Sequence, residues 1–336
     1  MATTISEIAK LAGVSRTTVS YVLNGKGNIP DSTRNRILKI MQEHEYQPNN
    51  NARRLAIGKN LRVGIFIPST EYLKRSVFFS EISATILPLI NQHGIDLVVE
   101  IYDNIYEHWL RKISGVDGVI LINPGNDSEH LQWLHNAKVP VVVVGRPDWN
   151  SSLPFVDGPN TEMAEEMTRR VLAHGHKDIL YILPDAYYTL TEDFLTGIKG
   201  VLNQHGSKVR AHYCYTTYGK ELQRDWLQQN LEQAGEVTAI LVDSDYKAVQ
   251  TLELLKQCGK RVPEDISLVC LSGSYLTQIP TPKICSSNQN VASIGEHAAK
   301  LLIDLLEGHA QQSTKPYKVD YCVIEGESLG DIKRKV

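Results

Sequence analysis

The stretch LAGVSRTTVSYVLNG, residues 11–25, decides how the N-terminal part of this 336-residue chain folds. Gly13 falls where a helix can end in the left-handed conformation, and Ser15 can cap a second helix by accepting a hydrogen bond from a later backbone amide. Val19 and Val22 then lie on one side of that second helix. The stretch therefore predicts two short helices joined by a tight turn. The apolar stripe of the first is expected to consist of Ile5, Ile8, Ala9, Leu11 and Ala12.

The opposite face of the predicted second helix carries Arg16, Thr17, Ser20 and Tyr21. These side chains make a poor core, but they suit contacts with base edges and phosphates. A helix-turn-helix has this layout, and its second helix enters the major groove of DNA. A plain αα-hairpin would give the same pattern, so the interpretation depends on the neighbouring sequence.

The neighbouring sequence favours DNA binding. Residues 1–60 contain nine lysines and arginines and four acidic residues, a charge of +5, whereas the whole chain has a formal net charge of −3. A basic head on an acidic body is expected when only one end of a chain meets a polyanion. Residues 31–43, DSTRNRILKIMQE, predict a third helix that closes a small core through Ile37, Leu38 and Met41.

Three segments of the chain resemble one protein family. TISEIAKLAGVSRTTVSYVLNG, TRNRILKIMQEHEYQPN and ARRLAIGK are similar to the lactose-repressor/galactose-repressor family of bacterial transcription regulators. The resemblance is close over residues 3–58 and looser over the rest of the chain. It implies a dimer that binds palindromic operators in double-stranded DNA, with a body like that of periplasmic sugar-binding proteins that senses a small molecule.

The resemblance assigns DNA contacts to the head. Arg16, Thr17 and Tyr21 fall where the family reads bases, and Tyr21 departs from the family because an arginine usually stands there. An arginine can pair with guanine through two hydrogen bonds, whereas tyrosine has one hydroxyl and an apolar ring, so the operator is expected to be atypical. The residues placed for phosphate contacts are Ser15, Thr18, Ser20, Asn24 and Thr33. Helix capping is the alternative role for Ser15 and Thr33.

Residues 49–59, NNNARRLAIGK, are basic and rich in asparagine, with too little apolar surface for a stable isolated helix. In the family this segment forms a hinge helix on DNA, and the leucine that Leu55 matches wedges into the minor groove and kinks the duplex. A flexible linker with a stray leucine is the alternative. The residues expected along the groove and backbone beside Leu55 are Asn49, Ala52, Arg53 and Arg54.

From residue 61 onward, apolar strands and helices alternate. The strand LRVGIFIP is followed by one helix that is expected to run to about residue 92, and a crossover near residue 160 separates two series of strands and helices. Apolar strands alternating with helices predict parallel sheets covered on both faces. The predicted fold is an α-helical helix-turn-helix head on an α/β body of two doubly wound parallel-sheet subdomains of periplasmic-binding-protein type.

This organisation divides the chain into three predicted parts. Their expected boundaries are 1–46 for the DNA-binding head, 47–60 for the hinge, and 61–336 for an effector-binding and dimerisation domain. Its two subdomains are expected at about 61–160 with 290–318, and at about 161–289 with 319–330. Ligands of such sheets bind beyond the carboxyl ends of the strands, so the cleft between the subdomains is the expected effector site.

Side chains near those strand ends are the candidates for effector binding. They are Ser69, Phe79, Asn123, Arg146, Asp185, Phe194, Asp245, Ser272 and Gln289, and each has an alternative role as a cap, a turn residue or a surface group. Phe194 stands where the family commonly has an arginine, and Ser272 where it has an aspartate. The two changes remove charge-assisted hydrogen bonds, so a simple pyranose held in the usual way is not expected. The expected effector is a sugar that is held differently, or a more aromatic metabolite near the tyrosines at 187, 188, 246 and 275.

Composition and motifs argue against other classes of protein. The sequence has no GxGxxG after a strand, no GxxxxGK[ST] and no GxSxG, so neither an enzyme nor a cofactor is expected. Five scattered cysteines without CxxC spacing fit a reducing cytoplasm and argue against disulfides and zinc. No signal peptide and no run of apolar residues long enough for a membrane span is visible.

The sequence therefore predicts a cytoplasmic, sequence-specific transcription regulator, expected to be a repressor whose operator affinity a small-molecule effector modulates. A homodimer is expected, because the C-terminus lacks the leucine heptads of a tetramerising tail. The alternative is a DNA-binding dimer whose body has lost small-molecule sensing and responds to a protein partner or to none.

Overall fold

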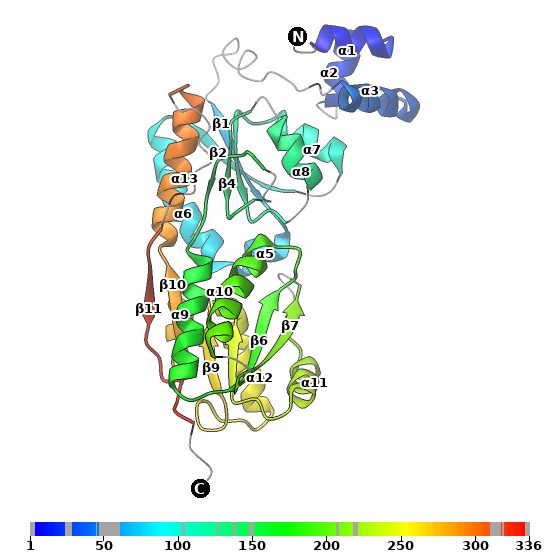
Figure 1. Ribbon diagram of the computed structural model, residues 1–336. Coiled ribbons are helices and arrows are strands. Elements are labelled where there is room, and N and C mark those ends of the chain that lie inside the picture. The colour runs from blue at the N-terminus through cyan, green and yellow to red at the C-terminus, as the bar shows by residue number, and fades with distance from the viewer. Residues whose placement is uncertain are drawn as a thin grey trace. The chain divides into compact units, whose positions relative to one another are not determined.

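Two compact units make up the chain (Figure 1). The first consists of Met1–Ser69, Ala84–Phe155 and Glu296–Lys315, and the second of Thr70–Ser83, Val156–Gly295 and Pro316–Val336. The computed structural model describes residues 4–23, 29–44, 46, 61–102, 105–125, 128–136, 139–147, 151–205, 208–217, 221–309, 317 and 319–332. The predicted hinge, residues 47–60, lies outside the described residues.

The first unit begins with the three predicted helices, α1 (Ile5–Ala12), α2 (Arg16–Leu23) and α3 (Asp31–Glu43). Thr4 and Glu7 form a capping box at the start of α1, and Gly13 ends that helix with a φ of 63°, as the sequence predicts. Ser15 Oγ accepts a hydrogen bond of 3.0 Å from the Thr18 amide, which confirms that Ser15 caps α2.

A small apolar core joins these helices. Its buried head residues are Ile8, Ala9, Ala12, Val19, Val22, Leu23, Ile37, Met41 and Tyr46, and Leu38 packs at its edge. Leu11 is 52% exposed, so the prediction that it belongs to the apolar stripe is wrong. Successive residues of an α-helix are about 100° apart, which turns Leu11 away from the side that Ile8 and Ala12 share.

The first unit continues with a sheet in the order β2-β1-β3-β4-β5, in which β1 pairs with β2 and β3, and β3 with β4, in parallel. Its strands are β1 (Arg62–Ile67), β2 (Asp96–Ile101), β3 (Gly118–Ile122), β4 (Val141–Val144) and β5 (Phe155–Val156). The surrounding helices are α6 (Val77–Gln92), α7 (Tyr106–Ile113), α8 (Ser128–His135) and α13 (Val291–Leu306). Trp109 of α7 and Leu131 of α8 pack with Val119 on one face, whereas Leu302 of α13 lies against Gly118 on the other. Both faces are therefore covered, as the sequence predicts.

The single helix predicted after β1 is two helices. The chain forms α5 (Thr70–Arg75), breaks at Ser76, and resumes as α6. Ser76 Oγ accepts a hydrogen bond of 3.0 Å from the Phe79 amide, so the break is a capped helix start. A serine inside an apolar periodic pattern is compatible with a continuous helix, which is why periodicity alone missed the break.

The second unit is built on a six-stranded sheet in the order β11-β10-β9-β8-β6-β7. Its strands are β6 (Asp178–Pro184), β7 (Arg210–Thr216), β8 (Ala239–Val242), β9 (Ser267–Cys270), β10 (Cys285–Gln289) and β11 (Tyr321–Ile324). All pairings are parallel except that of β10 with the edge strand β11. Its helices are α9 (Asn160–Ala173), α10 (Thr189–His205), α11 (Arg224–Ala234), α12 (Asp245–Gln257) and the 3-10 helix η2 (Tyr275–Gln278).

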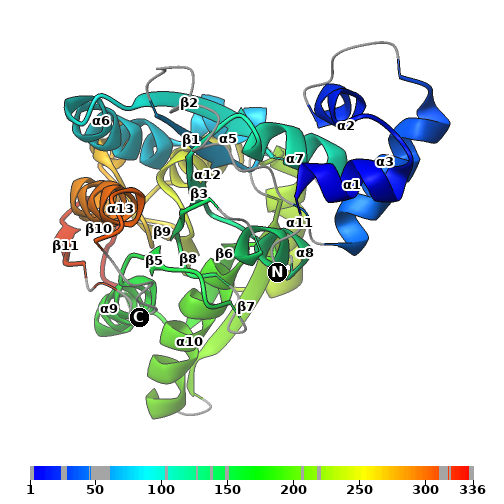
Figure 2. The same cartoon turned by 90° about the horizontal axis from the view of Figure 1, so that it is seen from above.

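Alternate residues of β6 enter two different apolar cores. Leu180 and Ile182 pack with α11 and α12, whereas Ile179 and Tyr181 pack with α9 and α10. On that second face α9 and α10 lie side by side (Figure 1, Figure 2). Both faces of the sheet are buried, which explains why β6 reads as a continuous apolar run.

Candidate DNA interface and effector site

The outer face of α2 presents the side chains expected to meet DNA. Arg16 and Thr17 are exposed, and Tyr21 keeps 44% of its surface exposed, while Val19 and Val22 point into the head core. The first turn of α2 contains no acidic residue. Because a helix N-terminus carries partial positive charge, this end of α2 suits contact with a phosphate.

The residues expected at phosphates differ in their local roles. Thr18 and Ser20 are half-buried on α2. Thr33 lies in the first turn of α3, but the N-cap of that helix is Pro30 and no side chain caps it, so the capping alternative for Thr33 is wrong. The remaining candidates lie outside the described residues: Asn24, Asn49, Ala52, Arg53 and Leu55.

Three effector candidates belong to the first unit, at the ends of its strands. Ser69 follows β1, Asn123 follows β3 and Arg146 follows β4. Asn123 has a φ of 45°, its amide donates to Val144 O at 2.8 Å, and its carbonyl accepts from Tyr102 Oη at 3.1 Å. A non-glycine residue in the left-handed region is uncommon, and here the two hydrogen bonds hold it at the sheet edge.

The second unit brings four further candidates to the carboxyl edge of its sheet. Asp185 follows β6, Asp245 begins α12 after β8, Ser272 follows β9 and Gln289 ends β10. Gln289 Nε2 donates to Ser272 Oγ at 3.4 Å, so these two side chains meet. Phe79, 7% exposed, lies in the same unit and packs edge-on against Tyr72 with 6.3 Å between ring centroids.

Asp245 is the most constrained of these residues. Its Oδ1 accepts a hydrogen bond of 2.6 Å from the Tyr246 amide, and its Oδ2 accepts one from the Ser274 hydroxyl. Burial raises the pKa of Asp245 above its usual value, although both hydrogen bonds favour the carboxylate. A carboxylate held in this way can accept hydrogen bonds from ligand hydroxyl or amino groups.

Phe194 does not lie at this edge. Its side chain has no exposed surface and packs in the apolar core between α9, α10 and the sheet, with Ala164 and Ile198. The prediction that Phe194 contacts the effector is therefore at odds with its position. An aromatic ring in place of an arginine favours this burial because it has no charge to hydrate.

Several polar residues near the same edge were not predicted from the sequence. Lys247 and Asp243 form an ion pair of 2.9 Å that is almost wholly buried, and Lys247 also donates to Thr216 Oγ1. The pKa of Glu81 on α6 is raised mainly by burial and to a smaller extent by the nearby Asp245 carboxylate. The i,i+4 spacing of Asp243 and Lys247 after a strand was the only signal for the pair, and such pairs are usually exposed.

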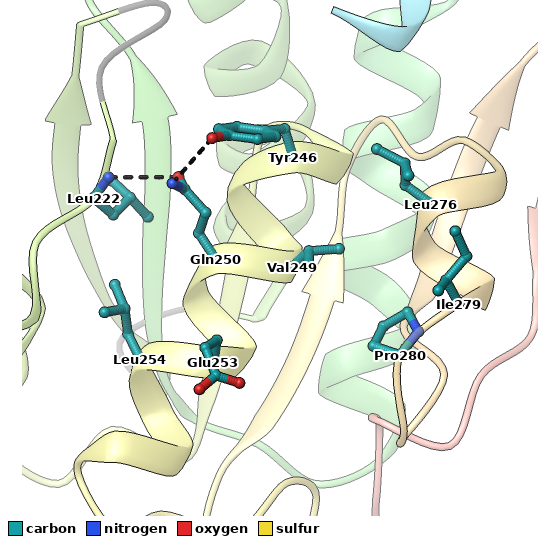
Figure 3. Close-up of a pocket in the computed structure, with 9 residues that line it drawn as sticks. All are labelled: Leu222, Tyr246, Val249, Gln250, Glu253, Leu254, Leu276, Ile279 and Pro280. Atoms are coloured by element: carbon teal, nitrogen blue, oxygen red, sulfur yellow. Dashed lines mark hydrogen bonds between the residues drawn. The ribbon is translucent and has the colours of Figure 1, made fainter. Parts of the chain in front are cut away.

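An apolar groove of about 570 Å³ lies on the outer side of α12 (Figure 3). Its lining residues are Leu222, Tyr246, Val249, Gln250, Glu253, Leu254, Leu276, Ile279 and Pro280. Gln250 crosses one end of it, where Oε1 accepts from the Leu222 amide at 3.4 Å and Nε2 donates to Tyr246 Oη at 3.5 Å. Ile279 and Tyr275 beside the groove are 67% and 60% exposed.

Two further features concern metal binding and membranes. Within the described part of the chain, no group of three or more histidine, cysteine, aspartate or glutamate side chains is placed to hold a metal ion. No described helix combines the length and the apolar character needed to cross a bilayer.

Known protein families match both ends of the chain. Residues 4–49 match the model of bacterial regulatory proteins of the lacI family, and residues 168–329 match the periplasmic binding protein-like domain. Catabolite control protein A of Staphylococcus epidermidis is 28% identical, over 96% of this chain and 98% of the relative. The same protein of Priestia megaterium is 27% identical, over the same shares.

Solved structures resemble nearly the whole chain. A complex of the transcriptional regulator CelR with cellobiose is 26% identical with a TM-score of 0.72, over 97% of this chain and 99% of that one. The lac repressor dimer bound to operator is 21% identical with a TM-score of 0.68, over 98% and 100%. The chain is therefore a DNA-binding transcription regulator of the lacI family, with a helix-turn-helix head and a periplasmic binding protein-like body.

Proposed function

We propose that this regulator is a repressor that binds a palindromic operator as a homodimer in the cytoplasm, without catalysing a reaction. The observation that carries the proposal is the exposed face of α2, where Arg16, Thr17 and Tyr21 stand clear of the head core. A single head reads one half-site, so a two-fold operator requires two copies of the chain. Leu55 and its neighbours in the hinge would add the minor-groove contact.

The groove beside α12 is the proposed dimer face of the second unit. Apolar surface bordered by exposed side chains such as Ile279 and Tyr275 is costly in water, and it commonly marks an interface. The proposed partner in this groove is a second copy of this chain, because a two-fold symmetric operator is bound by two copies. Sedimentation of Ile279→Asp should show a monomer at concentrations where the parent chain is a dimer.

A small molecule bound at the carboxyl edges of the sheets would modulate operator affinity. Asp245, Ser272 and Gln289 offer acceptors and donors for hydroxyl groups, and Phe79 offers an apolar ring, a combination suited to a sugar or a partly aromatic metabolite. The CelR relative binds cellobiose, which supports a sugar of more than one ring. Effector binding would favour one cleft arrangement and so change how the two hinges meet DNA.

The alternative is a DNA-binding dimer whose body no longer senses a small molecule and responds to a protein partner or to none. The burial of Phe194, where relatives of the family commonly have an arginine, favours it. Thermal-shift measurements against a panel of oligosaccharides, amino sugars and aromatic glycosides separate the two. A compound that raises the melting temperature and also changes operator affinity supports the sensor, whereas a panel without hits supports the alternative.

Selection of binding sites from random duplex DNA tests the proposal as a whole. The expected result is a palindrome, bound by two chains in a gel shift at moderate salt. Enrichment of a non-symmetric site would contradict the proposal. So would the absence of any enriched site, both with and without the panel compounds.

A further inference from the structure

Asp245 contacts two structural elements that border the apolar groove. The Tyr246 amide donates to its Oδ1 at 2.6 Å, and the Tyr246 ring lines the groove from α12. The Ser274 hydroxyl donates to its Oδ2, and Ser274 is the N-cap of η2. Leu276 of η2 and the following Ile279 line the groove from the opposite side (Figure 3).

Ser274 holds η2 through several bonds at once. Its Oγ accepts from the Leu276 amide at 3.2 Å, and its carbonyl accepts from the Thr277 amide at 3.1 Å and from Thr277 Oγ1 at 2.8 Å. Its side chain is 5% exposed, so water has little access to replace a lost partner. Thr277 ties η2 to β10 through Ile284 and Ser286, and the hydrogen bond from Ser274 to Asp245 ties it to α12.

We propose that Asp245 is a positioning residue that couples the effector edge to the groove, because it anchors Ser274 and through it the η2 wall. The inference rests on the proposed function in taking this edge as the effector site. A ligand hydroxyl or amino group that donates to Asp245 Oδ2 competes with the Ser274 hydroxyl for the charge of that oxygen and so weakens the Ser274 bond. Binding at the edge thus loosens one wall of the groove, and closure of the groove around a second copy disfavours such binding by the same factor.

Neighbouring residues at the same edge provide matched controls. Ser272 lies two positions before Ser274, but its hydroxyl accepts from Gln289 rather than donating to Asp245. Asp185 follows β6, and the hydrogen bonds found for it involve its own carbonyl with Tyr188 and Thr191 rather than η2. Substitution of Ser272 or of Asp185 removes a polar side chain from the edge but leaves the hydrogen bond between Ser274 and Asp245 intact.

Hydrogen exchange of the full-length chain tests the link without a ligand. Asp245→Ala should speed exchange of the amides at 275–279 about tenfold, the effect of losing one buried hydrogen bond. Ser274→Ala should speed exchange at least as much, because it also removes the cap on the Leu276 amide, and the double variant should exceed Ser274→Ala by little, because the bond to Asp245 is already lost. Ser274→Thr, which keeps the hydroxyl, should keep exchange slow, and Ser272→Ala and Asp185→Ala should leave exchange at 275–279 unchanged. Asp245→Asn is the milder substitute if Asp245→Ala lowers the melting temperature enough to expose the whole unit.

The outcomes separate this inference from the proposed function. Unchanged exchange at 275–279 in Asp245→Ala, or effects of the two single variants that add, would overturn the coupling. Faster exchange with an unchanged dimer dissociation constant in sedimentation would leave the coupling standing and remove the groove as dimer face. At concentrations where the chain is fully dimeric, the operator affinity of Ser274→Ala should match that of the parent chain. If neither the parent chain nor Ser274→Ala selects a DNA sequence, the proposed function is contradicted and the coupling is not.

Discussion

Lys247 Nζ lies 2.9 Å from Asp243 Oδ2, with only 4% and 2% of the two side chains exposed. The pair joins the end of β8 to the first turns of α12, and Lys247 extends it to Thr216 at the end of β7. Both charges have left water, so each depends on the other for its solvation. The pair therefore fixes the strand ends that carry the candidate effector residues.

Lys247→Met should lower the free energy of unfolding by about 3–5 kcal/mol, because it leaves Asp243 buried and unpaired. Urea unfolding followed by circular dichroism measures the change. The control is Lys300→Met, which breaks an exposed i,i+4 pair with Glu296 and should cost less than about 1 kcal/mol. Equal losses in the two variants would mean that burial of the pair has no energetic consequence.

Gly197→Ala should separate α10 from α9. A Cβ at Gly197 would lie 2.2 Å from the Thr161 carbonyl oxygen, which is backbone and cannot rotate away. We expect a loss of about 1–3 kcal/mol in unfolding free energy from this overpacking. Gly200→Ala on the same helix meets its nearest atom, Glu165 Oε1, at 3.8 Å, so it should be neutral or stabilise by up to about 1 kcal/mol through helix propensity. The reverse order of the two variants in thermal unfolding would refute the packing argument.

Stability should fall as the pH drops, in part through His176. This side chain is 4% exposed and its ring nitrogens bond Gly330 O at 2.9 Å and Thr238 Oγ1 at 3.1 Å. Burial lowers the pKa of His176 below its ordinary value of 6.5, with a smaller lowering from His174 and opposing effects from Gly330 and Asp331. The unfolded chain therefore binds the proton first, and the folded state loses stability as the pH falls below about 6.5.

His176→Gln should flatten the decline of the unfolding free energy between pH 7 and pH 5, since glutamine does not titrate. Urea titrations at half-unit steps of pH measure the slope. His205→Gln, at the exposed end of α10, is the matched control and should keep the parent slope. A steeper or unchanged slope in His176→Gln would contradict the assignment.

The sequence predicted the elements whose residues all face apolar surroundings. LRVGIFIP contains β1, Arg62–Ile67, because all residues of this strand after Arg62 are buried and its composition records that burial. Strand β10, CSSNQ, was missed because its core positions are serines: Ser286 and Ser287 are wholly buried, and their hydroxyls contact Thr277 Oγ1 and Leu271 O. Because the hydrogen-bond partners of Ser286 and Ser287 are not their neighbours in the sequence, the local sequence gives no sign that these serines are buried.

The candidate site was predicted in part for the same reason. Strand ends can be counted along the sequence, so Asp245 and Ser272 were found at the edge, whereas Gln289 ends β10, a strand that was not predicted. The bond between Asp245 and Ser274 depends on how the segment after β9 turns back over α12, which no periodicity reports. Phe194 was nominated by its place in a family motif, whereas its burial follows from the packing of α10 on α9.

Leu55→Ala should weaken binding to the selected operator strongly and leave binding to unrelated DNA nearly intact. The reason is that a side chain wedged into the minor groove contributes only where the operator centre can kink, whereas nonspecific affinity comes from phosphates. Gel shifts with both DNAs at one salt concentration measure the two constants. Arg53→Ala serves as the contrasting variant and should weaken both. Equal loss on both DNAs in Leu55→Ala would refute the wedge.

Tyr21→Arg should change which base is preferred in each half-site rather than overall affinity. Tyr21 is 44% exposed on α2, beside Arg16 and Thr17, so the new guanidinium reaches the same base edge. A bidentate pair with guanine is worth about 1–3 kcal/mol of discrimination, which corresponds to roughly fivefold to 160-fold enrichment of guanine at one position of the half-site. Tyr21→Phe removes only the hydroxyl, so a preference for thymine that depends on the ring should survive in it. Site selection from random DNA with the three proteins decides the matter, and identical preferred sequences for all three would show that Tyr21 does not read a base.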